Sequence, residues 1–287
     1  MSETHATARG QLLRTRALGV SAAALTALAL GGCLTDQVIE RPGRGIAEVT
    51  ETDPRAAQAN IESLSDVIRR NPSSPEAYNT RGAAYARLGR FQEAVDDFTQ
   101  AIRLDPNNFV AYTNRALAYR QSNRNDLARV DFDRAISANP NHAPAYIGRA
   151  NLLRVQGNLD QARADLDTAI RLNPENAQAF HARGLIHQKL GDNDRAVTDF
   201  DNAIDRDPFA AAPYQARGES LVTLGKYDKA IEDFNAALNV DSKSAMTWAW
   251  LGLAYDRSGN RVKAQESYQR ALFLDPGQPI AKQGARG

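Results

Sequence analysis

Residues 75–108 read PEAYNTRGAAYARLGRFQEAVDDFTQAIRLDPNN, and the same pattern returns every 34 residues through residue 278. Position 4 of each unit is aromatic, position 8 is Gly or Ala, and positions 20 and 27 are always Ala. The aromatic column consists of Tyr78, Tyr112, Tyr146, Phe180, Tyr214 and Trp248. A repeat of this length is one supersecondary unit that buries its apolar face only by stacking on its neighbours. The sequence therefore predicts six units, at 75–108, 109–142, 143–176, 177–210, 211–244 and 245–278.

Two turn signals divide every unit. Position 15 is Gly or, in the second unit, Asn123, and both residue types tolerate the left-handed backbone that ends a helix. Position 32 is Pro in every unit except the fifth, where Ser242 replaces it, and proline cannot continue a helix. Each unit is therefore predicted to be helix, short turn and helix. This pattern resembles the tetratricopeptide repeat family, which implies an all-α fold: a right-handed superhelical solenoid of six helical hairpins.

The segments that flank the repeats depart from the pattern, as terminal units of solenoids usually do. Residues 55–74 contain the same AsnPro dipeptide but carry Asn60 where the repeat has Ala, and we predict one N-terminal capping helix there. Residues 279–287 are a short C-terminal tail. Because this tail is too short for the full capping helix common in the family, we expect the last hairpin to be partly uncovered.

The first 33 residues have the layout of a secretory signal. A basic stretch precedes the apolar run 17–30, which is too short to span a bilayer comfortably. Residues 30–33, LeuGlyGlyCys, resemble the lipobox of bacterial lipoproteins, which implies that residues 1–32 are a signal peptide and that Cys33 is lipidated. Residues 33–54 contain Pro and Gly without sustained periodicity and are predicted to be a flexible tether.

This resemblance also predicts a location. An Asp directly after the cysteine retains enterobacterial lipoproteins in the inner membrane, and this chain has Leu34 there. We therefore expect a lipid-anchored protein of the cell envelope, held at the outer membrane and facing the periplasm. The alternatives are an uncleaved N-terminal anchor or a signal cut by the general peptidase, with Cys33 incidental in both cases.

Composition and charge argue against several other classes of protein. Lys and Arg total 35 against 34 for Asp and Glu, so no overall field attracts nucleic acid. A single cysteine builds neither an intramolecular disulfide nor a cysteine zinc cluster. His181 and His187 are six residues apart, unlike the four-residue spacing of a helical metal pair. We expect no enzyme activity, no cofactor and no metal site.

Charged residues recur in two columns of the repeat. Position 7 is Arg81, Arg115, Arg149, Arg183 and Arg217, and position 23 is Asp97, Asp131, Asp165, Asp199 and Asp233. Both columns change together in the sixth unit, to Leu251 and Ser267. This joint change favours structural ion pairs between the two helices of each unit, and a charged recognition stripe is the alternative.

The family resemblance places the first helix of each unit on the concave face. The candidate groove residues are Arg87, Arg120, Asn151, Arg154, His181 and Lys189. A groove that is basic over the first four units fits an acidic peptide, whereas a solvated helix face is the plainer interpretation. Trp250 and Phe273 are large where the other units are small or polar, which predicts an apolar contact patch at the C-terminal end unless the tail folds over it.

These observations predict a scaffold or adaptor that binds protein or peptide ligands of the cell envelope in a concave groove, tethered to the membrane by its lipid. The chain also resembles tetratricopeptide lipoproteins that act as pilotins, assembly factors for secretion or pilus systems. A chaperone-like module with an uncleaved N-terminal anchor is the third hypothesis. Whether two copies pair into a homodimer through their ends is left open by the sequence.

Overall fold

The computed structural model describes residues 54–286, and this part of the chain consists of α-helices joined by short turns. The first helix is α1 (Pro54–Arg70), and the last is α14 (Pro279–Gly284). Between them lie six hairpins: α2 (Pro75–Arg87) with α3 (Phe91–Leu104), α4 (Phe109–Gln121) with α5 (Asn125–Ala138), α6 (Ala143–Val155) with α7 (Leu159–Leu172), α8 (Ala177–Lys189) with α9 (Asn193–Arg206), α10 (Ala211–Thr223) with α11 (Tyr227–Val240), and α12 (Ala245–Arg257) with α13 (Arg261–Leu274). The predicted all-helical solenoid is confirmed.

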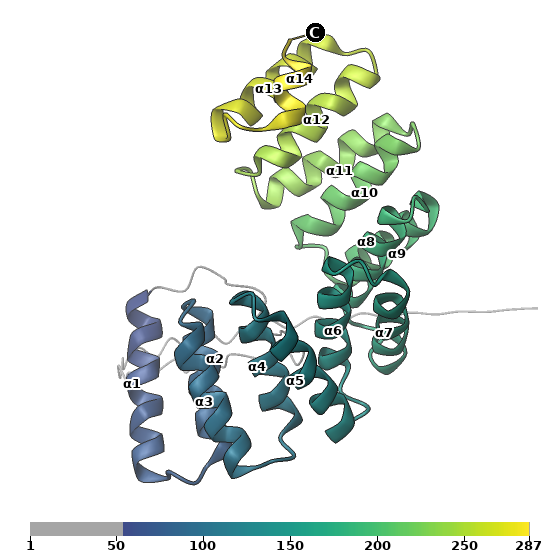
Figure 1. The fold of residues 1–287 in the computed structure, drawn as a ribbon. Coiled ribbons are helices and arrows are strands. Elements are labelled where there is room, and N and C mark those ends of the chain that lie inside the picture. Colours follow the sequence, from purple (N-terminus) through teal and green to yellow (C-terminus); the bar gives the residue numbers. More distant parts are fainter. Residues whose placement is uncertain (1–53, 287) are drawn as a thin grey trace, which may run out of the picture. The chain divides into compact units, whose positions relative to one another are not determined.

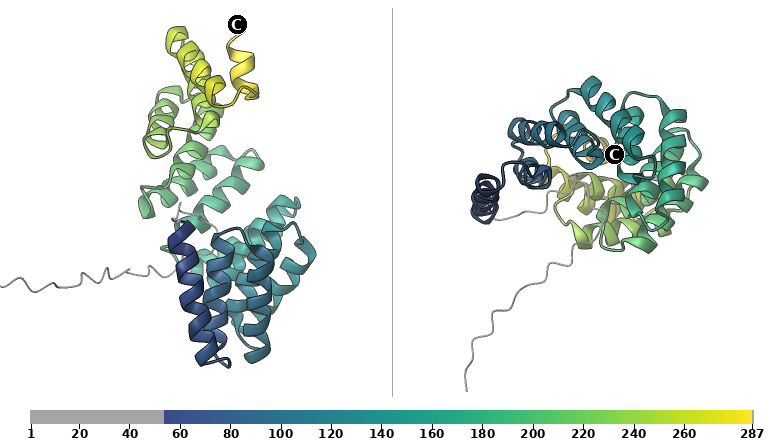
Figure 2. Two further views of the ribbon diagram at one scale, coloured as in Figure 1. Left: turned by 90° about the vertical axis from the view of Figure 1, so that its left-hand side faces the viewer. Right: turned by 90° about the horizontal axis from the view of Figure 1, so that it is seen from below.

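The hairpins stack in sequence order, from α1 against α2 to α14 against α12 and α13 (Figure 1). We call the first helix of each hairpin (α2, α4, α6, α8, α10, α12) the A helix and the second (α3, α5, α7, α9, α11, α13) the B helix. Each A helix contacts the A helix of the next hairpin, whereas the B helices of successive hairpins do not contact each other. A helices therefore line the inner, concave side of the curved path that Figure 2 shows.

Helix ends follow local chemistry. Asn108 and Asn176 each accept a hydrogen bond from the backbone N–H three residues later, which satisfies a donor that the first turn of the helix leaves open. At the predicted hairpin turn, Gly157 has φ of +84° and Asn123 has φ of +59°. The left-handed conformation expected at position 15 is therefore confirmed, including the unit that uses Asn.

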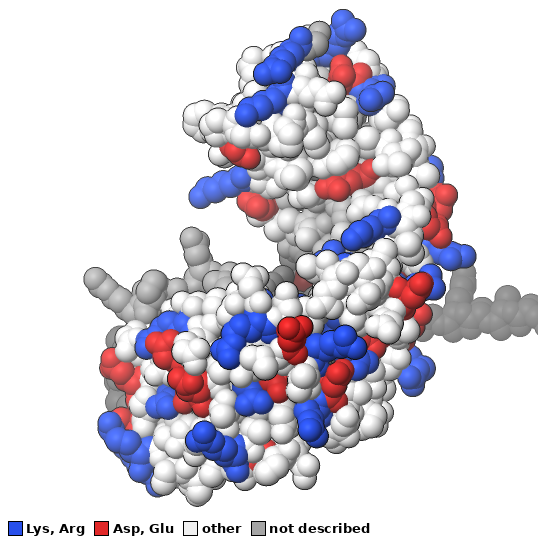
Figure 3. Space-filling view, viewed as in Figure 1, with Lys and Arg blue, Asp and Glu red and all other residues white. Residues whose placement is uncertain are grey.

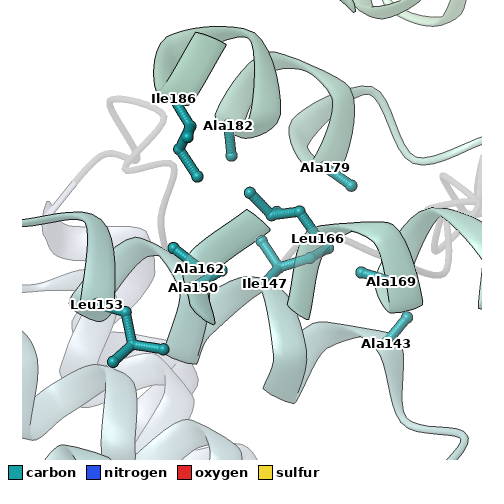
Figure 4. Close-up of a cluster of buried hydrophobic side chains, with 10 residues drawn as sticks. All are labelled: Ala143, Ile147, Ala150, Leu153, Ala162, Leu166, Ala169, Ala179, Ala182 and Ile186. Carbon is teal, nitrogen blue, oxygen red and sulfur yellow. The ribbon is translucent and has the colours of Figure 1, made fainter. Parts of the chain in front are cut away.

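The core is built from alanines that let helices approach and from one larger side chain in each unit that fills the space between them. Figure 4 shows one such cluster, in which Leu166 of α7 lies with Ile147 of α6 and Ile186 of α8. Leu166 and the alanines of α7 at positions 20 and 27, Ala162 and Ala169, are completely buried. Each hairpin thus shares its core with the next one, and no unit within residues 75–278 has an independent core.

The large residue at position 24 needs a glycine opposite it. In the fourth unit a Cβ on Gly184 would lie 2.6 Å from Cε1 of Phe200, and equivalent close approaches occur at Gly82, Gly218 and Gly252. The third unit has Leu166 in place of the ring and carries Ala150. In the second unit the ring of Phe132 instead reaches Gly148 of the next A helix, at 2.3 Å from a Cβ built there. Gly and Ala at position 8 are therefore not interchangeable.

The C-terminal end differs from the expected uncovered hairpin. Residues 279–284 form the short helix α14, and Ala281 on it is fully buried in a cluster with Ala249 and Tyr268. Gln278 caps this helix by accepting a hydrogen bond from Ala281 N at 2.7 Å. Six residues therefore suffice to cover the end of the last hairpin, because Ala281 and Ile280 pack against the cluster and the backbone approaches Tyr268 closely at Gly284.

Candidate functional site

Five arginines of the A helices pair with five aspartates of the B helices. Arg149 donates from Nε and Nη2 to both carboxylate oxygens of Asp165, at 2.8 and 2.7 Å. The same two-bond geometry joins Arg81 to Asp97, Arg115 to Asp131, Arg183 to Asp199 and Arg217 to Asp233. The predicted structural ion pairs are confirmed, and we call them the rungs.

Each rung has a further contact that the sequence columns alone did not suggest. The remaining nitrogen of Arg149, Nη1, donates to Asp133 of the preceding B helix at 2.7 Å. The equivalent acceptor in each rung lies on the helix before the hairpin, and the five acceptors are Ser65, Thr99, Asp133, Asp167 and Asp201. Ser65 belongs to α1, and the other four stand at position 25 of the preceding unit. Every one of these residues carries a side-chain oxygen, and this shared property is the sequence feature from which the contact could have been predicted. A rung therefore ties one hairpin to the helix that precedes it.

The rung environment favours the charged form of arginine. Hydrogen bonds to Asp165 raise the pKa of Arg149 despite the opposing effect of burial, and Asp133 adds to the increase. Its side chain is 23% exposed, whereas that of Asp165 is 10% exposed. The guanidinium also lies over the ring of Tyr146, at 5.8 Å from its centroid. A surface depression of about 460 Å³ between α5, α6 and α7 has Asp133, Arg149 and Asp165 in its lining, so it lies beside this rung.

Two other arginines, on the concave side, have different surroundings. Arg120 on α4 and Arg154 on α6 are half-buried at position 12 of their units. Burial lowers the pKa of both, and the positive charge of Arg154 lowers the pKa of Arg120 further. Within residues 54–286 no acidic side chain offsets either charge, and Arg154 Nε is buried without a hydrogen-bond partner. Arg120 and Arg154 are therefore two neighbouring cations on A helices without a carboxylate partner in the described residues, whereas every rung arginine has one.

His181 extends this basic cluster onto α8. Burial, and then the charge of Arg154, lowers the pKa of its imidazole to about 4, so the ring is neutral at physiological pH. Its ring centroid lies 5.8 Å from that of Phe200 on α9. Asn151 is half-buried on α6, one turn before Arg154. We call Arg120, Arg154 and His181 the basic cluster.

The structure does not join all of the predicted groove residues to this cluster. Arg87 and Lys189 occupy position 13, at the C-terminal ends of α2 and α8, and both side chains are exposed. His187, in contrast, is buried in the hairpin core with Nε2 3.7 Å from Asp199. The distinction between positions 12 and 13 follows from helix geometry, because one residue turns the side chain by about 100°.

The concave face of the later units is polar. Gln188 on α8 donates to the backbone oxygen of Ala216 and to Ser220 on α10, both at 3.2 Å. Gln215 donates to Glu219 at 2.9 Å and accepts from Thr247 on α12 at 2.8 Å. These bonds connect α8, α10 and α12 along the inner side of the stack, so the polar side chains there have set positions.

The two predicted apolar contact residues lie in different surroundings. Trp250 is half-buried and packs against the cluster that contains Leu221, Phe234 and Leu251. Phe273 is 76% exposed, with the Arg270 guanidinium 5.3 Å from its ring centroid. The side chain of Trp250 therefore contributes to the junction of the fifth and sixth hairpins, and the structure does not combine it with Phe273 in one uncovered patch.

Other classes of site gain no support from the described residues. Between residues 54 and 286 no three His, Cys, Asp or Glu side chains are grouped as metal ligands would be. In the same range no helix has both the length and the apolarity needed to cross a membrane. Cys33 and the predicted signal peptide lie outside the described residues. On the face drawn in Figure 3, basic and acidic side chains are interleaved over the N-terminal hairpins.

Family models described as tetratricopeptide repeat or TPR repeat match residues 75–108, 98–130, 132–164, 150–191, 177–209 and 216–279. The chain belongs to the tetratricopeptide repeat family. These matches cover the same stretch as the helical hairpins, and the family resemblance deduced from the repeat columns is confirmed. No curated protein sequence matches this tetratricopeptide protein.

Several solved structures share its fold. The Cut9–Hcn1 assembly of APC/C aligns with a TM-score of 0.72 at 19% identity over 80% of this chain, which spans only 46% of that chain. YrrB, described as a TPR protein with an unusual peptide-binding site, aligns with a TM-score of 0.55 at 24% identity over 67% of this chain and all of YrrB. PilW, a type IV pilus biogenesis factor, aligns with a TM-score of 0.66 at 19% identity, covering 73% of this chain and 97% of PilW.

Proposed function

We propose that this tetratricopeptide protein is a non-enzymatic adaptor that binds acidic segments of partner proteins on its concave face. The observation that supports this most strongly is the contrast between the rungs and the basic cluster. All five rung arginines have carboxylate partners in the fold. Arg120 and Arg154 have comparable burial, but no acidic side chain of the described chain offsets their charge.

The energetics of burial support a ligand at this cluster. Holding two like charges next to each other in a partly desolvated place disfavours the folded protein, because neither cation recovers the hydration it has lost. A carboxylate from a partner restores those interactions with charge-assisted hydrogen bonds, and the planar guanidinium groups suit a bidentate geometry. The cluster therefore gains more from an acidic ligand than an exposed lysine would gain.

The envelope location is part of the same proposal. The signal-like residues 1–32 and the single cysteine at the end of the LeuGlyGlyCys sequence support a lipid anchor at Cys33, with residues 34–53 as the tether. The adaptor is then held at the outer membrane on its periplasmic side, and its partners are peptide segments of other envelope proteins. Mass spectrometry of the intact N-terminus tests this step, since an uncleaved anchor leaves residues 1–32 in place.

The binding experiment uses two variants that change the net charge equally. In one, Arg120→Glu and Arg154→Glu reverse the basic cluster; in the other, Arg87→Glu and Lys189→Glu reverse the two exposed cations. Each immobilised variant is incubated with envelope extract of the host, and bound proteins are identified by mass spectrometry. We expect the first variant to lose specific partners by roughly tenfold or more in affinity, and the second to retain them.

Equal loss from both variants would show that a diffuse positive field attracts the ligands, and equal retention would exclude the concave cluster as the binding site. Circular dichroism and melting temperature of each variant establish that the fold is unchanged. The matched net charge makes the comparison independent of overall electrostatics.

A second candidate function is that of a pilotin-like assembly factor. The likeness to the pilus biogenesis factor PilW over almost the whole length of that protein suggests it. In the same extract experiment, a pilus or secretion-channel subunit among the bound proteins would favour this assembly role. Envelope proteins of other kinds among the bound proteins would favour the general scaffold.

A further inference from the structure

Glu219 gives the concave face a second charged position, on α10. Its side chain is half-buried at position 9 of the fifth unit, and burial raises the pKa of its carboxyl group. The neighbouring groups that hold it are neutral: Gln215 donates to it at 2.9 Å, and Thr247 orients Gln215 through a 2.8 Å hydrogen bond. Within residues 54–286 no lysine or arginine offsets its charge.

This acidic residue has no counterpart in the repeat. The other residues at position 9 are Ala83, Leu117, Asn151, Leu185 and Leu253. Packing of A helices does not require a carboxylate at this position, because five units stack without one. Its charge is therefore a feature of the concave surface of one unit, as the cations at position 12 are features of the second and third units.

We infer that the concave face recognises two opposite charges in one bound segment: an acidic side chain at Arg120 and Arg154, and a Lys or Arg side chain at Glu219. This inference rests on the proposed binding function and adds which charged residues the bound segment carries and how far apart they stand along it. A segment with only acidic residues would meet repulsion at Glu219. A segment with both signs places each charge opposite its complement and gains specificity from both contacts.

The stack sets the distance between the two charges in the ligand. Arg154 and Glu219 lie on α6 and α10, which are separated by two steps of A-helix packing through α8. Axes of packed helices are about 8–10 Å apart, so the two steps span roughly 16–20 Å. An extended peptide advances about 3.3 Å per residue, which places the basic residue roughly five or six positions from the acidic one.

A peptide-display selection tests this spacing and requires no identified partner. Random dodecapeptides displayed on phage are selected on immobilised protein comprising residues 54–287, which contain every helix that the structure describes. The same library is selected on the Glu219→Lys and Glu219→Gln variants. We expect peptides selected on the native protein to pair an acidic residue with Lys or Arg at a fixed separation of about five or six positions. On Glu219→Lys the basic residue should be replaced by Asp or Glu.

Affinities of synthetic peptides then quantify the contact. Exchanging the selected basic residue for Glu should weaken binding to the native protein roughly fivefold or more, and Glu219→Lys should restore it. Enrichment of acidic residues alone, unchanged by Glu219→Lys, would overturn the two-charge inference while leaving the basic cluster intact as a binding site. Selection of peptides without any acidic preference would overturn both proposals.

The N-terminal segment is an alternative occupant, since residues 34–53 also contain acidic and basic residues. The selected peptides are therefore titrated against a longer form that begins at residue 34. Unchanged affinity supports an external partner. Loss of binding in the longer form, restored when its acidic residues are replaced, would assign the face to the chain's own N-terminus and overturn the inference.

Discussion

Replacing Arg149 with Leu removes one rung and leaves Asp165 as a carboxylate without its partner. The Asp165 side chain is only 10% exposed, and both of its oxygens accept hydrogen bonds from Arg149. Breaking a fully buried pair from one side costs about 3–5 kcal/mol, and an exposed pair contributes about 1 kcal/mol or less. Because the Arg149 side chain is 23% exposed, we expect the free energy of unfolding to fall by about 2–3 kcal/mol.

The sixth unit provides the matched control, because it has Leu251 and Ser267 at the two rung positions. Arg149→Leu combined with Asp165→Ser removes both charges and copies this natural solution. The double variant should recover most of the loss and remain within about 1 kcal/mol of the native protein. Guanidinium unfolding of the form comprising residues 54–287, followed by far-UV circular dichroism, measures the native protein, both single variants and the double variant.

Two outcomes of this double-mutant cycle would refute the structural role of the rung. If Arg149→Leu alone costs less than about 1 kcal/mol, the rung behaves as a surface ion pair and does not set the register of the stack. If the double variant is as unstable as the sum of the two single variants, no coupling exists between the residues. Asp133 remains in every variant and is half-exposed, so it makes a small contribution to each comparison.

Substitutions at three other positions test separate features. Gly184→Ala should destabilise the protein by about 1–3 kcal/mol because the added Cβ meets the Phe200 ring. In a Phe200→Leu background the same change should be neutral or stabilising, since Ala is more favourable than Gly in a helix by about 1 kcal/mol. Thermal unfolding distinguishes the two signs. In the folded protein His181 has a pKa of about 4, below its ordinary value of 6.5. Its contribution to stability is therefore present above pH 6.5 and is lost as the pH falls from 6.5 towards 4. The difference in unfolding free energy between the native protein and His181→Asn should shrink by about 1–2 kcal/mol between about pH 7 and about pH 5. Asn123→Ala should cost about 1 kcal/mol at its positive φ, and Asn123→Gly should be tolerated within about 0.5 kcal/mol in the same melting assay.

The fold was predictable because the repeat supplies the same evidence six times. The left-handed turn at position 15 and the pairing of Arg149 with Asp165 both follow from columns of residue types. The sixth unit supports the prediction of this pairing, because both partners change together there. Repetition thus substitutes for an alignment of relatives within a single chain.

Contacts between units were harder to predict because they join different columns. The bond from Arg149 to Asp133 crosses from one unit to another, and the relation between Gly148 and the Phe132 ring does so as well. Gly and Ala at position 8 look like equivalent small residues in the sequence, although the ring at position 24 decides between them. Side-chain reach across a helix boundary depends on crossing angles, which residue types do not encode directly.

The candidate site was predictable only in part, since exposure changes between adjacent positions of one helix. Arg154 and Lys189 are similar basic residues near a helix end, yet one is half-buried and the other is exposed. The position of α14 over Tyr268 likewise depended on how a six-residue helix packs, which periodicity cannot indicate.

The rungs also determine how the protein comes apart. Arg149 on α6 donates hydrogen bonds both to Asp165 on α7, in its own hairpin, and to Asp133 on α5, in the hairpin before it. Detaching the third hairpin therefore also breaks a contact with the second. We therefore expect the first five hairpins to unfold cooperatively across unit boundaries. The sixth hairpin has Leu251 in place of a rung arginine, so it lacks the guanidinium that bonds each earlier hairpin to the helix before it. Because it is also the last hairpin of the stack, its amide protons should exchange with solvent faster than those of the central hairpins.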